Sequence, residues 1–192
     1  MPDGVTGDPP LLFYIRGHHP KYGAAVPEAQ SLASSQQAFE QSELGPIAEA
    51  TGHALLVTYK SAIPATPARV REFAKLTGFK FSKLVVAAHS GAHDGLGRTL
   101  DAGTPIDRLV LLDMFYPRSK VLAVKIAERF PKPGRCAGFV TTHNLKRYED
   151  VYQPLLKDNC PVEPFENADH TPAVARCLAS YMAGDRCIPR KP

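Results

Sequence analysis

The sequence lacks any apolar run that approaches the roughly 18 residues a helix needs to cross a membrane. It also lacks a dense block of lysine and arginine, because the basic residues behind its net charge of +4 are spread along the chain. Nucleic-acid-binding proteins usually gather such residues on one face. We therefore expect neither a membrane span nor a nucleic-acid partner.

Motifs for metal and phosphate binding are also missing. The four cysteines follow no Cys-x-x-Cys or Cys/His spacing typical of a zinc site. The chain has no G-x-G-x-x-G or G-x-x-x-x-G-K-[ST] loop to hold a nucleotide phosphate. We expect a protein that needs neither a metal ion nor a cofactor.

Length and composition fit one compact domain. The 192 residues are 44% hydrophobic and 22% charged, values that are ordinary for a globular protein. A chain of this length can bury about 70% of its unfolded surface, so it can build a core without a metal. No linker, repeat or low-complexity segment interrupts it, and we predict a single domain over residues 1–192.

Continuous apolar segments alternate with segments of helical character. The predicted strands cover residues 11–15, 54–58, 84–88, 108–113, 137–141 and 162–165. The predicted helices cover residues 27–41, 67–76, 119–130, 146–157 and 172–182. Strands that are apolar throughout are typical of a parallel sheet covered on both faces. The pattern predicts an α/β three-layer sandwich, with a parallel six-stranded sheet between two layers of helices.

The third predicted strand runs into His89-Ser90-Gly91-Ala92 and then into a segment that can turn helical. A serine on a sharp strand-to-helix turn is a nucleophile elbow, in which the flanking residues are small because a larger side chain would collide with the neighbouring backbone. The usual flanks are glycines, and here they are Ala88 and Ala92. The pattern predicts that Ser90 is a nucleophile; the alternative is a serine that caps the following helix.

Functional residues of parallel sheets collect at the carboxyl ends of the strands. Three of the predicted ends carry Ser90, Asp113 and His170, in that chain order. This order of nucleophile, acid and base is the one expected for a hydrolase of the α/β class. The order of the three residues therefore suggests a catalytic mechanism, which the short motif around Ser90 does not do alone.

The chain resembles the α/β-hydrolases, in particular small bacterial members with the elbow His89-Ser90-Gly91-Ala92 and a next strand that ends Leu111-Leu112-Asp113, followed by an aromatic residue. The resemblance implies a minimal core of that fold, without its first edge strands and without a lid. Such a core implies an open site for a large or polymeric substrate. Arg16-Gly17 stands where the family usually has His-Gly.

The candidate reaction is cleavage of an ester or amide bond through an acyl-enzyme. His170 would take the proton of Ser90, and Asp113 would fix the tautomer of that histidine. The backbone N–H groups of Gly91 and His18 would hold the oxyanion. The class that stays open beside this one is a hydrolase-like protein that binds a ligand without catalysis. Two local alternatives also stay open: His170 as a surface loop residue and Asp113 as a helix cap.

Asp113 is chosen as the acid by comparison with the other carboxylates near the predicted site. The commoner position, after the next strand, reads Thr142-His143-Asn144 and holds no carboxylate. Asp169 is the immediate neighbour of His170, and adjacent side chains on an extended loop point apart. Asp94 lies just past the nucleophile, where it is better placed to face substrate.

Four further histidines lie near the predicted strand ends and are candidates for substrate contact. They are His19, His89, His93 and His143. Because the rims of active sites are polar in any case, a structural role is the alternative for each of them. We do not assign the adjacent pair His18 and His19 to a metal ion, because neighbouring loop residues rarely face the same ion.

All four cysteines lie in the last third of the chain, and two disulfides, Cys136–Cys160 and Cys177–Cys187, are the simplest of the three possible pairings. Disulfides persist in oxidising compartments, so this pairing predicts a secreted or periplasmic protein whose leader is not part of this sequence. The alternative is a cytoplasmic protein with four buried thiols.

Overall fold

A computed structural model describes residues 7–17, 43–58, 60–115, 120–156, 158–165, 170–185 and 187. Six strands form one all-parallel sheet in the order β2-β1-β3-β4-β5-β6. The strands are β1 Leu11–Ile15, β2 Ala54–Val57, β3 Leu84–His89, β4 Arg108–Leu112, β5 Cys136–Thr141 and β6 Val162–Phe165. The helices are α3 Gly45–Ala50, α4 Pro67–Thr77, α5 His93–Asp101, α6 Lys120–Arg129, α7 Thr142–Arg147, α8 Gln153–Leu156 and α9 His170–Ala183.

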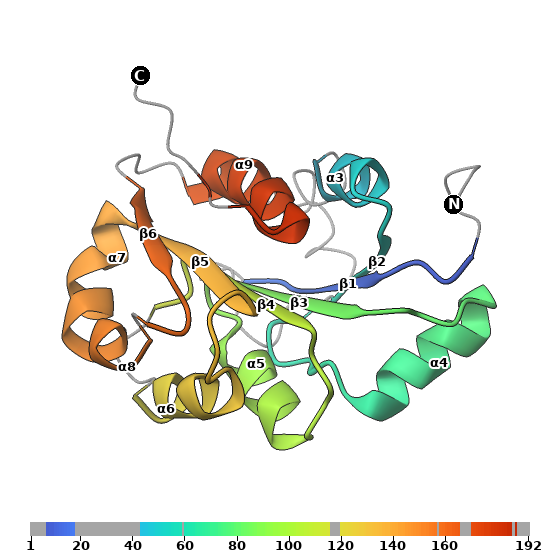
Figure 1. The fold of residues 1–192 in the computed structure, drawn as a ribbon, viewed down its shortest axis with the longest axis horizontal. Coiled ribbons are helices and arrows are strands. Elements are labelled where there is room, and N and C mark those ends of the chain that lie inside the picture. Colours follow the sequence, from blue (N-terminus) through green and yellow to red (C-terminus); the bar gives the residue numbers. More distant parts are fainter. Residues whose placement is uncertain are drawn as a thin grey trace.

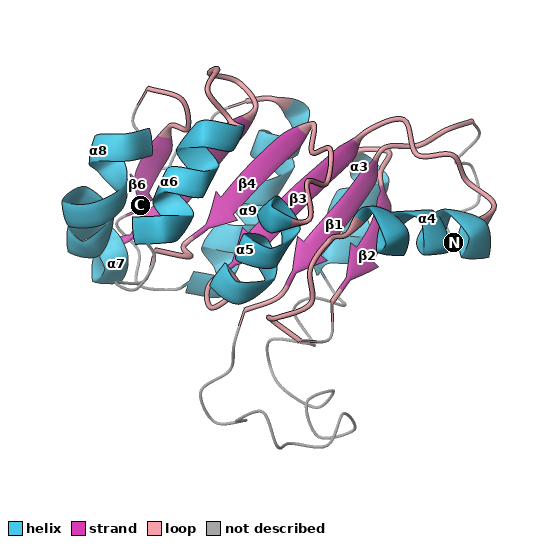
Figure 2. Cartoon of the chain, turned by 90° about the horizontal axis from the view of Figure 1, so that it is seen from below, coloured by secondary structure: helices cyan, strands magenta, loops and turns pink. Residues whose placement is uncertain are grey.

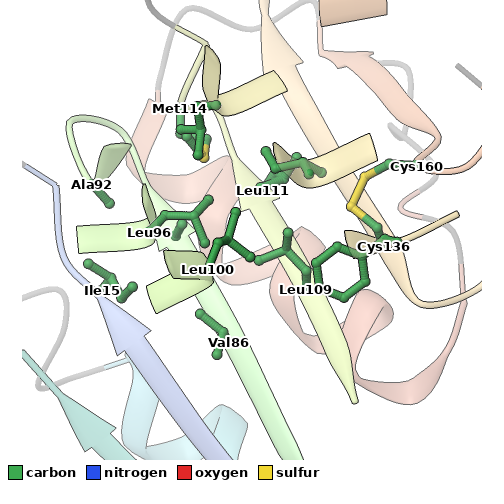
Figure 3. Close-up of a cluster of buried hydrophobic side chains, with 14 of the residues drawn as sticks. Ile15, Val86, Ala92, Leu96, Leu100, Leu109, Leu111, Met114, Cys136 and Cys160 are labelled. Atoms are coloured by element: carbon green, nitrogen blue, oxygen red, sulfur yellow. A yellow bond between two sulfur atoms is a disulfide. The ribbon is translucent and has the colours of Figure 1, made fainter. Parts of the chain in front are cut away.

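Helices cover both faces of the sheet, which confirms the predicted α/β sandwich. Figure 1 shows α3 and α9 on one face and α4, α5 and α6 on the other, with α7 and α8 beside β6. Successive residues of a strand point to opposite faces, so each strand contributes to two hydrophobic clusters. Leu11, Phe13 and Ile15 join the cluster under α5 and α6, part of which appears in Figure 3. Leu12 and Tyr14 join the cluster under α9.

Strand positions follow the prediction to within one residue at each end, and β1 to β5 are apolar runs bounded by polar or turn residues. Helix α4 also begins as predicted, with Pro67 in its first turn and the Thr66 hydroxyl accepting the N–H of Arg69 at 3.2 Å. The predicted helix 27–41 lies outside the described residues. Among these residues, no helix is long and apolar enough to span a bilayer.

Two predicted helix starts are wrong. The helix expected over 146–157 begins at Thr142, directly after β5, and includes a π-helical turn, Tyr148–Tyr152. Thr141 is extended (φ −76°, ψ 159°), and no glycine or proline follows it before Pro154, so the chain enters the helix at once. The last helix begins at His170 and not at Pro172, since a proline is tolerated within the first turn.

The sheet order reverses between β1 and β3, which are neighbours although β2 lies between them in the chain. Open α/β sheets bind ligands at this point, outside the carboxyl ends of the strands, because the loops there leave in opposite directions. The carboxyl ends of β1 and β3 carry Arg16 and Ser90. The topology therefore gives the predicted nucleophile a position typical of a functional site.

Both predicted disulfides are present. Cys136 at the start of β5 is bonded to Cys160, just before β6, and Cys177 of α9 is bonded to Cys187. The first joins two neighbouring strands at their amino ends, and the second ties the segment after α9 back to that helix. The first therefore reinforces a pair of strands that the sheet already joins, and the second fixes a segment outside the sheet.

We expect each disulfide to contribute about 3 kcal/mol to stability, because the closed loops span 24 and 10 residues and restrict the unfolded chain. The intact mass of the native protein should be lower by two hydrogens for each disulfide than that of the reduced protein. Thermal unfolding of the paired variants Cys136→Ala/Cys160→Ala and Cys177→Ala/Cys187→Ala should show a lower melting temperature in both. Titration of four free thiols in the native, unreduced protein would contradict this prediction.

Candidate functional site

The turn after β3 has the backbone of a nucleophile elbow. Ser90 has a φ of 51°, in the left-handed region that residues with a side chain seldom adopt. Among the described non-glycine residues, only Ser90 and Asp113 have a positive φ. Such a conformation costs about 1–3 kcal/mol and persists only where the surrounding structure enforces it.

Hydrogen bonds on both sides enforce the turn at Ser90. Its N–H donates to the carbonyl of Leu112 at 2.9 Å, which extends the ladder between β3 and β4 by one residue. The N–H of Ala92 donates to the carbonyl of His89 at 3.1 Å and closes the turn. Ala92 occupies the N-cap position of α5, and no side chain caps that helix. Ser90 lies two residues before this N-cap position.

Helix α5 approaches the sheet closely because of Gly95. The N–H of Gly95 donates to the carbonyl of Ser61 at 3.1 Å. A Cβ atom on Gly95 would lie 2.3 Å from that oxygen and 2.9 Å from Cγ2 of Ile15. Glycine at this position lets the helix leave the elbow directly against the end of β1.

Asp113 stands beside Ser90 at the carboxyl edge of the sheet. His89 is paired with Leu112 in the parallel register, so the next residue of each strand is its neighbour across the edge. The Asp113 carboxylate is 1% exposed and is held by Thr141 at the end of β5. Its Oδ1 accepts the Thr141 N–H at 2.9 Å, and its Oδ2 accepts the Thr141 hydroxyl at 2.8 Å. A carboxylate with both oxygens bonded in this way has a fixed orientation.

Packing also fixes the segment after Asp113. The ring of Phe115 contacts Tyr148 and Tyr152 edge-on, with centroids 4.9 and 5.0 Å apart. Burial raises the pKa of Tyr148 to about 12, so its hydroxyl stays protonated at neutral pH. The aromatic contacts anchor the backbone just beyond the candidate acid.

The position of His170 follows from the direction of α9. Near the other end of this helix the Tyr181 hydroxyl bonds to the carbonyl of Gly138 in β5 at 2.5 Å and to Glu163 in β6 at 2.8 Å. His170 precedes Tyr181 by eleven residues, which is about 16 Å along a helix. The helix runs back over the sheet after β6, so its first residue lies at the carboxyl edge. The structure describes the backbone of His170 but not its side chain.

The other histidines occupy different surroundings. His89 is 1% exposed, and its Nδ1 lies 2.7 Å from the Tyr14 hydroxyl of β1. His93 opens α5, with Nε2 3.6 Å from Asp94 Oδ1. His143 is exposed in the first turn of α7. The predicted residues His18 and His19 lie outside the described residues.

A polar groove begins beside the elbow, between α5 and α6. Its volume is about 330 Å³, and it starts at His93. Its lining includes charged groups of both signs: Asp94, Arg98, Asp101 and Lys125. Lys125 Nζ lies 2.5 Å from Asp101 Oδ1. The groove suits polar groups of a substrate better than a long apolar chain.

The N–H of Gly91, the predicted oxyanion donor, makes no hydrogen bond to any of the described residues. It directly follows Ser90, the predicted nucleophile, which is the position of one oxyanion donor in a nucleophile elbow. Within the same described ranges, no group of three or more histidine, cysteine or acidic residues is arranged to hold a metal ion.

Comparisons with known proteins found nothing similar. A scan against family models, a search of curated proteins and a search of solved structures each gave no significant match. Evidence for function therefore comes from the geometry of this chain alone.

Two buried residues at this edge were not among the predicted site residues. Arg16 is only 8% exposed at the end of β1, and its backbone N–H donates to the Thr58 hydroxyl at 3.2 Å. Thr141 orients Asp113, as described above. Arg16 could have been predicted from the sequence, because it is a cation directly after a fully apolar strand. Thr141 could not, because its contact with Asp113 depends on the register between β4 and β5.

Replacement of Gly95 by alanine should destabilise the protein by about 1–3 kcal/mol, because the new Cβ would overlap the carbonyl of Ser61. Gly97 is the matched control: it lies in the same helix, and a Cβ there would meet nothing within 4 Å. Gly97→Ala should stabilise by about 0.5–1 kcal/mol, since alanine is the better helix former. Equal effects of the two changes on the free energy of unfolding, measured in urea, would show that α5 does not dock as described.

Proposed function

We propose that this protein is a serine hydrolase that cleaves an ester or amide bond with a Ser90-Asp113-His170 triad. The observation that carries the proposal is the left-handed backbone of Ser90 on a strand–turn–helix at the reversal point of the sheet. A serine held in this strained turn exposes its hydroxyl at the sheet edge.

The reaction would proceed in two stages. In the first, His170 takes the proton of the Ser90 hydroxyl as the oxygen attacks the carbonyl carbon of the substrate. The resulting oxyanion would be held by the N–H of Gly91 and that of His18, and the leaving group would depart with the proton from His170. In the second stage, water attacks the acyl-enzyme with the same histidine as base, and Ser90 regains its proton.

Asp113 would stabilise the protonated form of His170 in both stages. Its fixed orientation supports this role, because Thr141 holds both carboxylate oxygens at the edge that α9 approaches. The carboxylate also lies on the strand next to that of Ser90. For substrate, the charged groove beside His93 supports a polar molecule.

A location outside the cytoplasm, either secreted or periplasmic, belongs to the same proposal. Two disulfides support it, since such bonds persist in oxidising compartments. A hydrolase in that setting meets substrates such as extracellular esters and peptide or cell-wall fragments. A panel of these compounds is the direct way to find the substrate.

A fluorophosphonate probe should label the wild-type protein at Ser90, and Ser90→Ala should abolish both labelling and hydrolysis without a change in melting temperature. Ser82→Ala is the matched control, because Ser82 is exposed just before the opposite end of β3. That variant should be labelled at the wild-type rate. A wild-type protein that binds compounds from the panel but never reacts with the probe would be a ligand-binding protein instead of an enzyme.

Replacement of Asp113 by asparagine should lower turnover by up to about 10⁴-fold with little change in substrate binding, because the amide favours the wrong histidine tautomer. The amide would also face one of the two Thr141 donors with an NH₂ group, so a stability control is needed. Thr141→Val removes one of these hydrogen bonds and keeps the carboxylate. Near-normal turnover in Asp113→Asn together with an inactive Asp94→Asn would assign the acid to Asp94.

A further inference from the structure

The outer edge of β2 is unpaired in the described part of the chain. β2 is the last strand in the sheet order, with β1 as its neighbour. On the side of β1, the N–H of Ala54 donates to Pro10 and that of Thr58 donates to Tyr14, each at 2.9 Å. In a parallel strand alternate residues point to the same side, so the N–H and C=O groups of Leu55 and Val57 point outward. No described residue bonds to them.

The side chains along this edge are also only partly covered by the rest of the protein. Exposed sheet edges are usually protected by lysine, proline or a bulge, and Ala54–Val57 has none of these. All four residues are only half-buried. Cavities of about 460 and 200 Å³ lie along the strand, and Phe73 of α4 lines both. Helix α4, which Figure 2 shows beside β2, has no fully buried residue and leaves Leu76 79% exposed.

We propose that this edge pairs with the same edge of a second copy of the chain, so that two sheets join into one around a two-fold axis. A second copy is chosen because the strand is self-complementary in its hydrogen bonds, carries no charge, and is flanked by residues of opposite charge on α4. With the axis at Leu56, Leu55 of each copy lies opposite Val57 of the other. In each such pair, the N–H of one residue donates to the C=O of the other, in both directions. The outward N–H and C=O groups of Leu55 and Val57 then all have hydrogen-bond partners, so the strand edge no longer carries unpaired backbone groups.

Charge and hydrophobicity agree with self-pairing. The strand carries no charge, so no like charges meet across the seam. It is apolar on both faces, with Ala54 and Leu56 toward one hydrophobic cluster and Leu55 and Val57 toward the other. The axis also makes the two α4 helices antiparallel on one face. Arg69 and Glu72, both exposed at the smaller cavity, can then each meet the opposite charge of the other copy.

Light scattering after gel filtration, over roughly 1 to 100 µM protein, tests the proposal. The wild-type mass should rise toward twice the 20.9 kDa of the chain. Val57→Pro removes only the outward N–H and should raise the dissociation constant about tenfold or more, because each dimer loses two hydrogen bonds. Hydrogen exchange at Leu55 and Val57 should slow as the dimer forms, whereas exchange at Leu56 should not change.

Leu76→Glu provides a second test that leaves the strand untouched, with Val121→Glu as its control. Both residues are exposed on helices, at 79% and 68%, but Val121 lies on α6, away from this edge. Leu76→Glu should weaken the dimer, and Val121→Glu should not. A wild-type mass of 20.9 kDa throughout, or a dimer that Leu76→Glu and a folded Val57→Pro leave unchanged, would overturn the proposal.

Discussion

The left-handed turns at Ser90 and Asp113 are the constraint on which the candidate site depends. Both follow a buried parallel strand, and each N–H still continues the ladder, to Leu112 and to Phe139. The backbone then turns within one residue. About 1–3 kcal/mol of strain at each turn is offset by these buried hydrogen bonds. The result is that the polar side chains of Ser90 and Asp113 stand next to each other at one edge of the sheet.

The same constraint determines how α5 leaves the sheet. A chain that turns sharply at Ser90 has only Gly91 and Ala92 before α5 begins, so the helix starts against the end of β1. Only a residue without a side chain fits at Gly95 in that approach. Strain at the elbow, the small residues around it and the glycine one turn later are therefore parts of one arrangement. A serine that merely capped a helix would require none of them.

Sequence reasoning succeeded where hydrophobic pattern alone decides the structure. Strands of a covered parallel sheet are apolar on both faces, which made β1 to β5 visible as runs, whereas β6 contains Glu163 and Pro164 and forms no such run. The left-handed backbone of Ser90 and Asp113 was not predictable, because neither is glycine and the turn is enforced by neighbouring strands. The start of α7 was missed for a different reason: the strand end at Thr141 was predicted, but Thr142, His143 and Asn144 were taken for a loop although the helix begins at Thr142.

The two edges of this sheet differ in a way that bears on both proposals. The edge strand β6 contains Pro164, which cannot donate to a further strand, and a disulfide ties its approach to β5. The other edge, β2, has no such protection. A two-fold axis at Leu56 makes the paired strands antiparallel, so the carboxyl edges of the two sheets point in opposite directions. Each Ser90 follows β3, which lies two strands from β2 and so about 12 Å from the seam in the sheet direction. Self-pairing would therefore leave both candidate sites open and independent of each other.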